Sequence, residues 1–305
     1  MDQHTSAELA RILHAALTAA RSPFASTMGS APDPMRESSY PSDVKGRILS
    51  DVLTEHGPGF LLAVGQHARR VPPTPVLSVL TNAQPPAVTA EKWTRLERYH
   101  HSSHRTLLEE VTPCRIAIRR ASRSTPPSLA ENLLIAGCLF ALMAPEGYLE
   151  IAALRLRRED LPGAELPSGM DAACFAVSWT EHLEVPHAAS LAEQTRSPPD
   201  LPSLLASDVS RRWSLAEAAR TLALSPRSLQ RKLALEGKTF SSVVRSVRMG
   251  EAARLLADPT AGLADIGYCC GYADQAHFQR DFVRANRLTP GAYRKIIAEG
   301  THRHA

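Results

Sequence analysis

The sequence predicts a helix-rich α+β region with few strands, followed by an all-α region. Three observations support this prediction. Residues 114–120 and 149–157 alternate apolar with charged or polar side chains, which is the period of a half-buried strand. Helical spacing and one long apolar run dominate the rest of the first two hundred residues. From residue 207 onward, helix caps and helical periodicity follow one another without a strand signal.

Length and composition limit the class of protein. The chain has 305 residues, 44% of them apolar, which suffices for two globular domains. No run approaches the ~18 apolar residues that a membrane span needs. The start, Met-Asp-Gln-His-Thr, lacks the order of a signal peptide, and the five cysteines show no metal-ligand spacing. We therefore expect a protein of the reducing cytoplasm with no membrane contact, no metal and no cofactor.

The net charge of +4 is unevenly distributed along the chain. Residues 205–300 contain fifteen Lys and Arg against nine Asp and Glu, whereas residues 1–204 contain nineteen against twenty-two. A basic region beside a slightly acidic one is typical of a polyanion-binding module joined to a second domain. A solvated basic face would have the same composition, so charge alone leaves both interpretations open.

The N-terminal domain is predicted over residues 1–200. Its helices are expected at about 9–17, 42–55, 60–68, 76–80, 91–109 and 129–143. Its strands are expected at 114–120, 149–157 and 173–179. Pro, Ser and Gly predict a flexible segment at 22–42 and a linker at 197–206.

The C-terminal domain is predicted over residues 207–296, with a flexible tail at 297–305. Ser214 and Glu217 have the spacing of a capping box, in which each side chain satisfies a backbone donor at the start of a helix. The run 240–257 carries an apolar stripe at helical spacing and predicts one long helix.

Two segments of this domain repeat a small turn followed by a short helix. In the first, the turn is at Ala223 and the helix at about 226–236. Apolar residues on both sides of the turn face inward and leave Arg227, Gln230 and Arg231 pointing outward.

The second segment follows some forty-five residues later, with its turn at Gly271. Its helix is expected at about 273–285, where Gln275, Gln279 and Arg280 point outward. Arg can bridge O6 and N7 of guanine, and Gln can pair with N6 and N7 of adenine. A solvated polar face would explain one such unit, but two matching units joined by a long helix favour binding of double-stranded DNA through two helix-turn-helix units.

On these residues the C-terminal domain resembles the AraC/XylS family of transcription regulators. The resemblance rests on 224–233, on 271–282 and on the closing motif at 288–294, and it covers about 205–296. It implies two helix-turn-helix subdomains joined by the helix at 240–257, whose recognition helices enter successive major-groove segments. It also implies RNA polymerase as a partner.

Four positions depart from the family pattern. Ala223 and Arg287 stand where glycine is usual, and Gly262 stands where a hydroxyl cap is usual. Ala276 leaves one outward position of the second unit without a polar side chain. We therefore expect the second unit to contribute positioning more than base discrimination.

The N-terminal domain resembles the α/β effector or oligomerisation domain of a subgroup of these regulators. The resemblance rests on the patterns at 97–105 and 131–137. The predicted strands are too few for the β-rich cupin pocket of the sugar-sensing members. We expect this domain to sense a small molecule, to dimerise, or both.

Other features support different interpretations less well. His100 and His104 would share a face of the helix predicted at 91–109, but no third zinc ligand stands at suitable spacing. Cys269 and Cys270 are expected to be buried thiols rather than a redox sensor. The Pro-Cys-Arg around Cys114 partly resembles the Pro-Cys-His-Arg of DNA alkyltransferases, but the His is absent and Cys114 begins a strand-like run, so no enzyme is expected. The alternatives are a methyl-transfer repair protein with a DNA-binding tail and a ligand-independent dimeric regulator.

Overall fold

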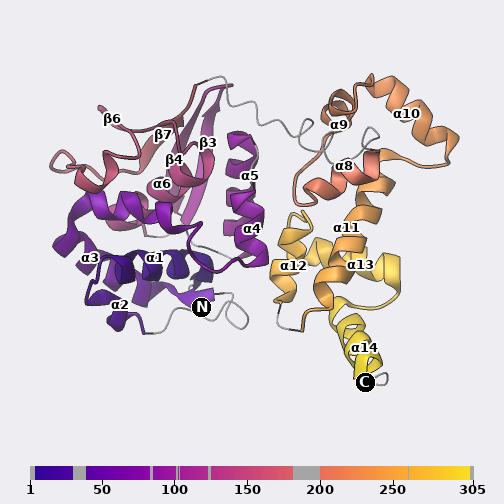
Figure 1. Cartoon of the computed structure of the whole chain (residues 1–305), viewed down its shortest axis with the longest axis horizontal. Coiled ribbons are helices and arrows are strands. Elements are labelled where there is room, and N and C mark those ends of the chain that lie inside the picture. Colours follow the sequence, from indigo (N-terminus) through magenta and orange to yellow (C-terminus); the bar gives the residue numbers. More distant parts are fainter. Residues whose placement is uncertain are drawn as a thin grey trace. The chain divides into compact units, whose positions relative to one another are not determined.

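The computed structural model describes residues 4–29, 39–82, 85–100, 102, 104–122, 125–180, 200–259 and 261–302. The chain divides into two compact units, residues 1–184 and 185–305, and each is described by itself (Figure 1). The structure is helix-rich, with a small antiparallel sheet in the first unit. Within the described residues, no helix is both long enough and apolar enough to cross a membrane.

The helices of the first unit pack in layers below and beside the sheet (Figure 1). They are α1 (Ala7–Ala19), α2 (Phe24–Thr27), α3 (Ser42–Ala63), α4 (Pro75–Thr81), α5 (Pro86–Tyr99) and α6 (Leu129–Met143). Two short 3₁₀ turns are η1 (Val64–His67) and η2 (Leu161–Gly163). The helices predicted at 9–17, 76–80 and 129–143 are confirmed.

Five strands form the antiparallel sheet, in the order β3-β4-β7-β5-β6. They are β3 (His104–Val111), β4 (Arg115–Ser122), β5 (Tyr148–Ile151), β6 (Leu154–Leu156) and β7 (Cys174–Ser178). Ile118, Ile151 and Val177 are among its buried side chains, and α6 packs on the sheet through β5 and β7. A separate pair joins β1 (His4–Ser6) and β2 (Ser39–Pro41).

Helix α6 is the centre of this unit. Its start is a capping box, because the N–H of Glu131 donates to the Ser128 hydroxyl and the Glu131 carboxylate accepts from the Ser128 N–H. A Cβ on Gly137 would lie 2.1 Å from the Leu62 carbonyl oxygen, so α6 can approach α3 this closely only through a glycine.

The helix predicted at 91–109 is wrong beyond Tyr99. Residues 104–111 form strand β3, which pairs with β4 along most of its length. Glu97, in the last turn of α5, accepts hydrogen bonds from the N–H and hydroxyl of Thr106 at 2.6 and 2.8 Å and pairs with Arg120 at 2.6 Å. These long-range bonds hold the end of α5 against the two strands. His104 therefore lies on a strand, and the premise that it shares a helix face with His100 is also wrong.

Three further predictions differ from the structure in detail. The single strand predicted at 149–157 is the hairpin of β5 and β6, with a turn at Ala152, which has φ of +50°. The flexible segment predicted at 22–42 contains α2 and β2, and residues 30–38 of it lie outside the described residues. The flexible tail predicted at 297–305 is helical as far as His302.

The predicted linker at 197–206 is a helix in its second half. Residues 197–199 lie outside the described residues, but α8 (Leu201–Ser207) begins directly after Asp200. The Asp200 carboxylate caps this helix by accepting from the N–H of Ser203 at 2.9 Å. Leu201 and Leu204 are buried in the core of the second unit, which explains why the segment is ordered.

The second unit is all helical. After α8 come α9 (Leu215–Thr221), α10 (Pro226–Leu235), α11 (Phe240–Leu256), α12 (Leu263–Cys269), α13 (Gln275–Asn286) and α14 (Pro290–His302). Helices α9 and α10 pack together as one pair and α12 and α13 as another, and α11 runs between the pairs (Figure 1).

Each helix pair has its own apolar core. The core at the first pair is made of leucines, alanines and one valine, and its buried members are Leu201, Leu204, Leu205, Ala218, Ala219, Leu229, Leu233 and Val243. The second pair is built on aromatic rings, because Phe278 and Phe282 are fully buried and Phe282 packs edge-on against Tyr293. Burying one such side chain contributes about 1.5–3 kcal/mol, so these anchors fix the rotation of α10 and α13.

Candidate nucleic-acid interface

The first helix pair presents its outward residues as the sequence predicts. The capping box of Ser214 and Glu217 is confirmed, with the N–H of Glu217 donating to the Ser214 hydroxyl at 3.1 Å. Helix α10 starts at Ser225, whose hydroxyl accepts from the N–H of Ser228 at 3.0 Å. Because Leu229 and Leu233 are buried, the opposite face of α10 is exposed. That face carries Arg227, Gln230 and Arg231.

The second helix pair is arranged in the same way. The Asp274 carboxylate caps α13 by accepting from the N–H of His277 at 2.7 Å. Phe278 and Phe282 point into the core, and the outward face carries Gln275, Gln279 and Arg280, all exposed.

These six side chains therefore lie as two sets of three, one on each pair. None of them makes a side-chain hydrogen bond or ion pair within the part of the chain that the structure describes. Their polar groups are therefore available to a binding partner, because the fold does not depend on side-chain hydrogen bonds or ion pairs from them. Arg227 to Arg231 on α10 and Gln275 to Arg280 on α13 each span about one to two helical turns.

The turn of the second pair is also where the two pairs meet. Gly271 has φ of +77°, and a Cβ there would lie 2.8 Å from the Val209 carbonyl oxygen and 3.1 Å from that of Ser210. The same Cβ would lie 2.9 Å from a terminal nitrogen of Arg248 on α11. The chain leading into α9 thus rests on the turn before α13, and only glycine fits between them.

Buried titratable groups surround this contact. Burial, and then the Asp281 carboxylate, raise the pKa of Tyr272, whose hydroxyl donates to Asp281 over 3.5 Å. Burial also raises the pKa of Cys270, so its thiol stays protonated and is a poor nucleophile. Cys269 and Cys270 are both buried, as predicted.

Sequence reasoning missed a group of cations beside the same turn. Arg212, Arg245 and Arg248 line a cleft of about 410 Å³ together with His277 and Asp281. These residues come from three separate stretches of the chain, and only the spacing of Arg245 and Arg248 on one face of α11 hints at them in the sequence.

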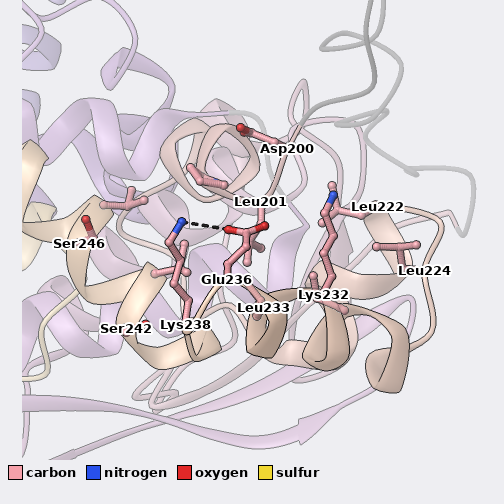
Figure 2. A pocket seen from close by; sticks show the side chains of 14 residues that line it. Asp200, Leu201, Leu222, Leu224, Lys232, Leu233, Glu236, Lys238, Ser242 and Ser246 are labelled. Carbon is pink, nitrogen blue, oxygen red and sulfur yellow. Dashed lines mark hydrogen bonds and ion pairs between the residues drawn. The ribbon is translucent and has the colours of Figure 1, made fainter.

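A second hollow of about 660 Å³ lies between α8, α10 and α11 (Figure 2). Its floor is apolar, with Leu201, Leu233 and Val243, and on its rim the Lys238 ammonium pairs with the Glu236 carboxylate at 2.9 Å. Leu233 and Glu236 are on the side of α10 away from Arg231, so this hollow is separate from the exposed polar face.

Residues 218–296 match a family model described as a helix-turn-helix domain. This C-terminal region is a helix-turn-helix domain of the AraC type. The transcriptional regulator SirC of Salmonella typhimurium is 34% identical over 95 residues, which are 31% of this chain and 32% of that protein. The HTH-type transcriptional regulator VirS of Mycobacterium tuberculosis is 40% identical over 80 residues, 26% of this chain and 24% of that protein.

The chain thus spans about a third or less of the length of these curated relatives. A crystal structure of the transcriptional regulator CdpR from Pseudomonas aeruginosa aligns with 93% of this chain and 97% of that chain. The sequence identity is 19% and the TM-score is 0.34, so this similarity is too weak to indicate a shared fold or function.

The turn of the first pair is expected to be strained. Ala223 has φ of +55°, a left-handed conformation that costs a residue with a Cβ about 1–2 kcal/mol. Ala223→Gly should therefore raise the free energy of unfolding by about 0.5–1 kcal/mol in urea denaturation, after the greater entropy of glycine in the unfolded chain is subtracted. The matched control is Ala234→Gly, an exposed residue in the last turn of α10, which should lower it by up to about 1 kcal/mol. Equal destabilisation by both substitutions would show that the turn is unstrained.

Proposed function

We propose that this chain is a sequence-specific DNA-binding transcription regulator. The observation that carries the proposal is the pair of exposed polar triplets on α10 and α13, in a domain of the AraC type. The relatives that match this domain are named as transcriptional regulators, and one from Escherichia coli is named as a urease operon transcriptional activator. We accordingly expect activation of transcription through RNA polymerase, in the cytoplasm.

In this proposal α9–α10 and α12–α13 are two helix-turn-helix units joined by α11. The first helix of each unit braces the second, and α10 and α13 enter successive major-groove segments of one duplex. Arg227, Gln230 and Arg231 form the fuller set of base-reading groups. The second unit has Ala276 at one outward position and would contribute more to positioning than to base discrimination.

The N-terminal domain, residues 1–200, would sense a small molecule, dimerise, or both. What supports sensing is a cavity of about 40 Å³ lined by residues of α1, α3, α4, α5 and α6 and of strands β3 and β4. Leucines are the commonest residues of its lining, but Arg120, Glu97, Lys45 and Glu131 also line it. Arg120 pairs with Glu97 at 2.6 Å, and Lys45 pairs with Glu131 at 3.3 Å.

The Nε of Arg120 is buried and finds no hydrogen-bond acceptor among the described residues. A buried donor without an acceptor costs about 1–3 kcal/mol, so an oxygen atom that enters the cavity would be stabilised there. Lys45, Arg120, Glu97 and Glu131 balance in charge, and the third carboxylate of the lining, Glu8, pairs with Arg11 at 2.7 Å, which favours an uncharged ligand with a carbonyl or hydroxyl oxygen. A space this small admits such a ligand only if the side chains that line it move apart.

Thermal-shift screening of the full chain against small uncharged carbonyl and hydroxyl compounds tests this role. At least one compound should raise the melting temperature, because binding to the native state alone stabilises it. Leu134→Phe, which fills the cavity from α6, should remove that response. If no compound shifts the wild-type protein, sensing through this cavity is rejected and dimerisation remains as the role of the domain.

Nothing favours the methyl-transfer alternative. Cys114 is exposed in the bend between β3 and β4, and within the described residues no hydrogen bond joins its thiol to a histidine or a carboxylate. A nucleophilic thiol needs such a neighbour, or a local positive charge, to ionise at neutral pH. We therefore propose no enzymatic activity.

Arg231 provides the direct test of base reading. On a site obtained by in vitro selection, Arg231→Ala should weaken binding by about 1–3 kcal/mol and relax the preference at one base pair. The control is Arg254→Ala, an exposed arginine on α11 that pairs with Glu251 and should leave binding unchanged. Equal weakening on selected and random duplexes would make Arg231 a phosphate contact, and unchanged binding would contradict its role altogether.

A further inference from the structure

The cleft beside Gly271 connects the beginnings of the two helix pairs. Arg212 and Trp213 line it from the segment that leads into α9, and His277 lines it from the first turn of α13. Arg245 and Arg248 reach it from the middle of α11. The cleft of about 410 Å³ is thus formed by both pairs and by the helix that joins them.

Positive charge predominates in this cleft. The lining includes three guanidinium groups, those of Arg212, Arg245 and Arg248, and one carboxylate, that of Asp281. The Asp281 carboxylate is itself shared, since Arg245 lies 3.4 Å and Arg284 3.3 Å from its oxygens. Among the residues that line the cleft, cations therefore outnumber carboxylates.

The walls of the cleft strengthen this field. Trp213, Phe240 and Tyr272 form part of its lining, and Arg248 lies 5.4 Å from the centre of the Tyr272 ring. Apolar walls of low dielectric focus the field of the charges between them and attract an anion more strongly than an open surface does. Arg245 keeps 45% of its side chain exposed, so its guanidinium can leave Asp281 for an incoming anion.

The position of the cleft indicates which anion it would bind. His277 follows Gln275 on α13 and lies at the flank of the outward face, beside Arg280. Arg212 comes two residues before Ser214, the cap of α9, and in a helix-turn-helix the first helix crosses the DNA backbone. If the outward faces of α10 and α13 both contact one duplex, its sugar-phosphate backbone would therefore cross this cleft.

We propose that the cleft binds the phosphate backbone of the DNA between the two segments that α10 and α13 contact, with Arg212 and Arg245 as the phosphate-binding groups. The inference rests on the proposed function. A guanidinium suits this role because it donates two parallel hydrogen bonds to phosphate oxygens. Such contacts set the register of the protein on the duplex and carry no base preference.

The test compares two arginines of the same helix. Arg245 and Arg254 both lie on α11, and both pair with a carboxylate, Asp281 or Glu251. Only Arg245 lines the cleft. The affinities of the full-length wild type, Arg245→Gln and Arg254→Gln are measured between about 50 and 200 mM salt, on a selected site and on a random duplex.

Arg245→Gln should reduce the slope of log K against log salt by about 0.9 on both duplexes, the value for one lost phosphate contact. The ratio of affinities for the two duplexes should not change. Arg254→Gln should keep the wild-type slope, and adding Arg212→Gln to Arg245→Gln should remove about 0.9 more.

An unchanged slope for Arg245→Gln beside a steep wild-type slope would overturn the phosphate cleft and leave the proposed function intact. A loss confined to the selected site would also overturn it, because it would make Arg245 a base contact. If the wild-type protein selects no DNA site at all, the proposed function itself is contradicted, and the wild-type selection experiment alone shows this.

Discussion

The second unit depends on the contact between Gly271 and the backbone that leads into α9. With the Val209 carbonyl oxygen 2.8 Å from the position of a Cβ, no larger residue fits without moving one helix pair from the other. Helix α11 supplies the covalent connection between the pairs, and Arg248 packs against the same turn. Because the contact joins backbone to backbone, it restricts rotation of the pairs about α11 more strongly than surface side chains could.

This restraint matters for DNA binding because it keeps the exposed residues of α10 at a constant distance from those of α13. Two polar triplets on independent units could each bind DNA weakly, whereas two triplets held at a constant separation define one longer site. The proposed phosphate cleft lies at the restrained junction itself. In this account the junction positions the recognition helices, and its cations would hold the backbone that passes between them.

Sequence reasoning worked well where local signals decide the structure. The capping box at Ser214 places the start of α9 where predicted, and the buried Leu229 and Phe278 place α10 and α13 close to their predicted bounds, because short amphipathic helices are determined by caps and periodicity. It also identified Ala223 as a departure from the usual glycine, and the structure gives this residue a left-handed backbone.

Sequence reasoning did less well where distant residues decide the structure. The segment 104–111 has no strong period of its own and becomes a strand because β4 pairs with it and Glu97 bonds to Thr106. Likewise Arg212 and Arg245 are far apart in the chain, and only the tertiary contact at Gly271 brings them into one cleft. Neither arrangement leaves a periodic pattern in the sequence.

Changing the spacing of the two half-sites, the DNA segments bound by α10 and α13, tests most directly whether the two helix pairs bind DNA as one rigid unit. Once a selected site is known, about 5 or about 10 base pairs, half a turn or a full turn of DNA, are inserted between its halves, and affinity is measured. Both insertions should reduce binding to the level of a single half-site, since the distance between α10 and α13 is constant. Affinity that survives the full-turn insertion would show two independently tethered units and contradict the central role of the Gly271 contact.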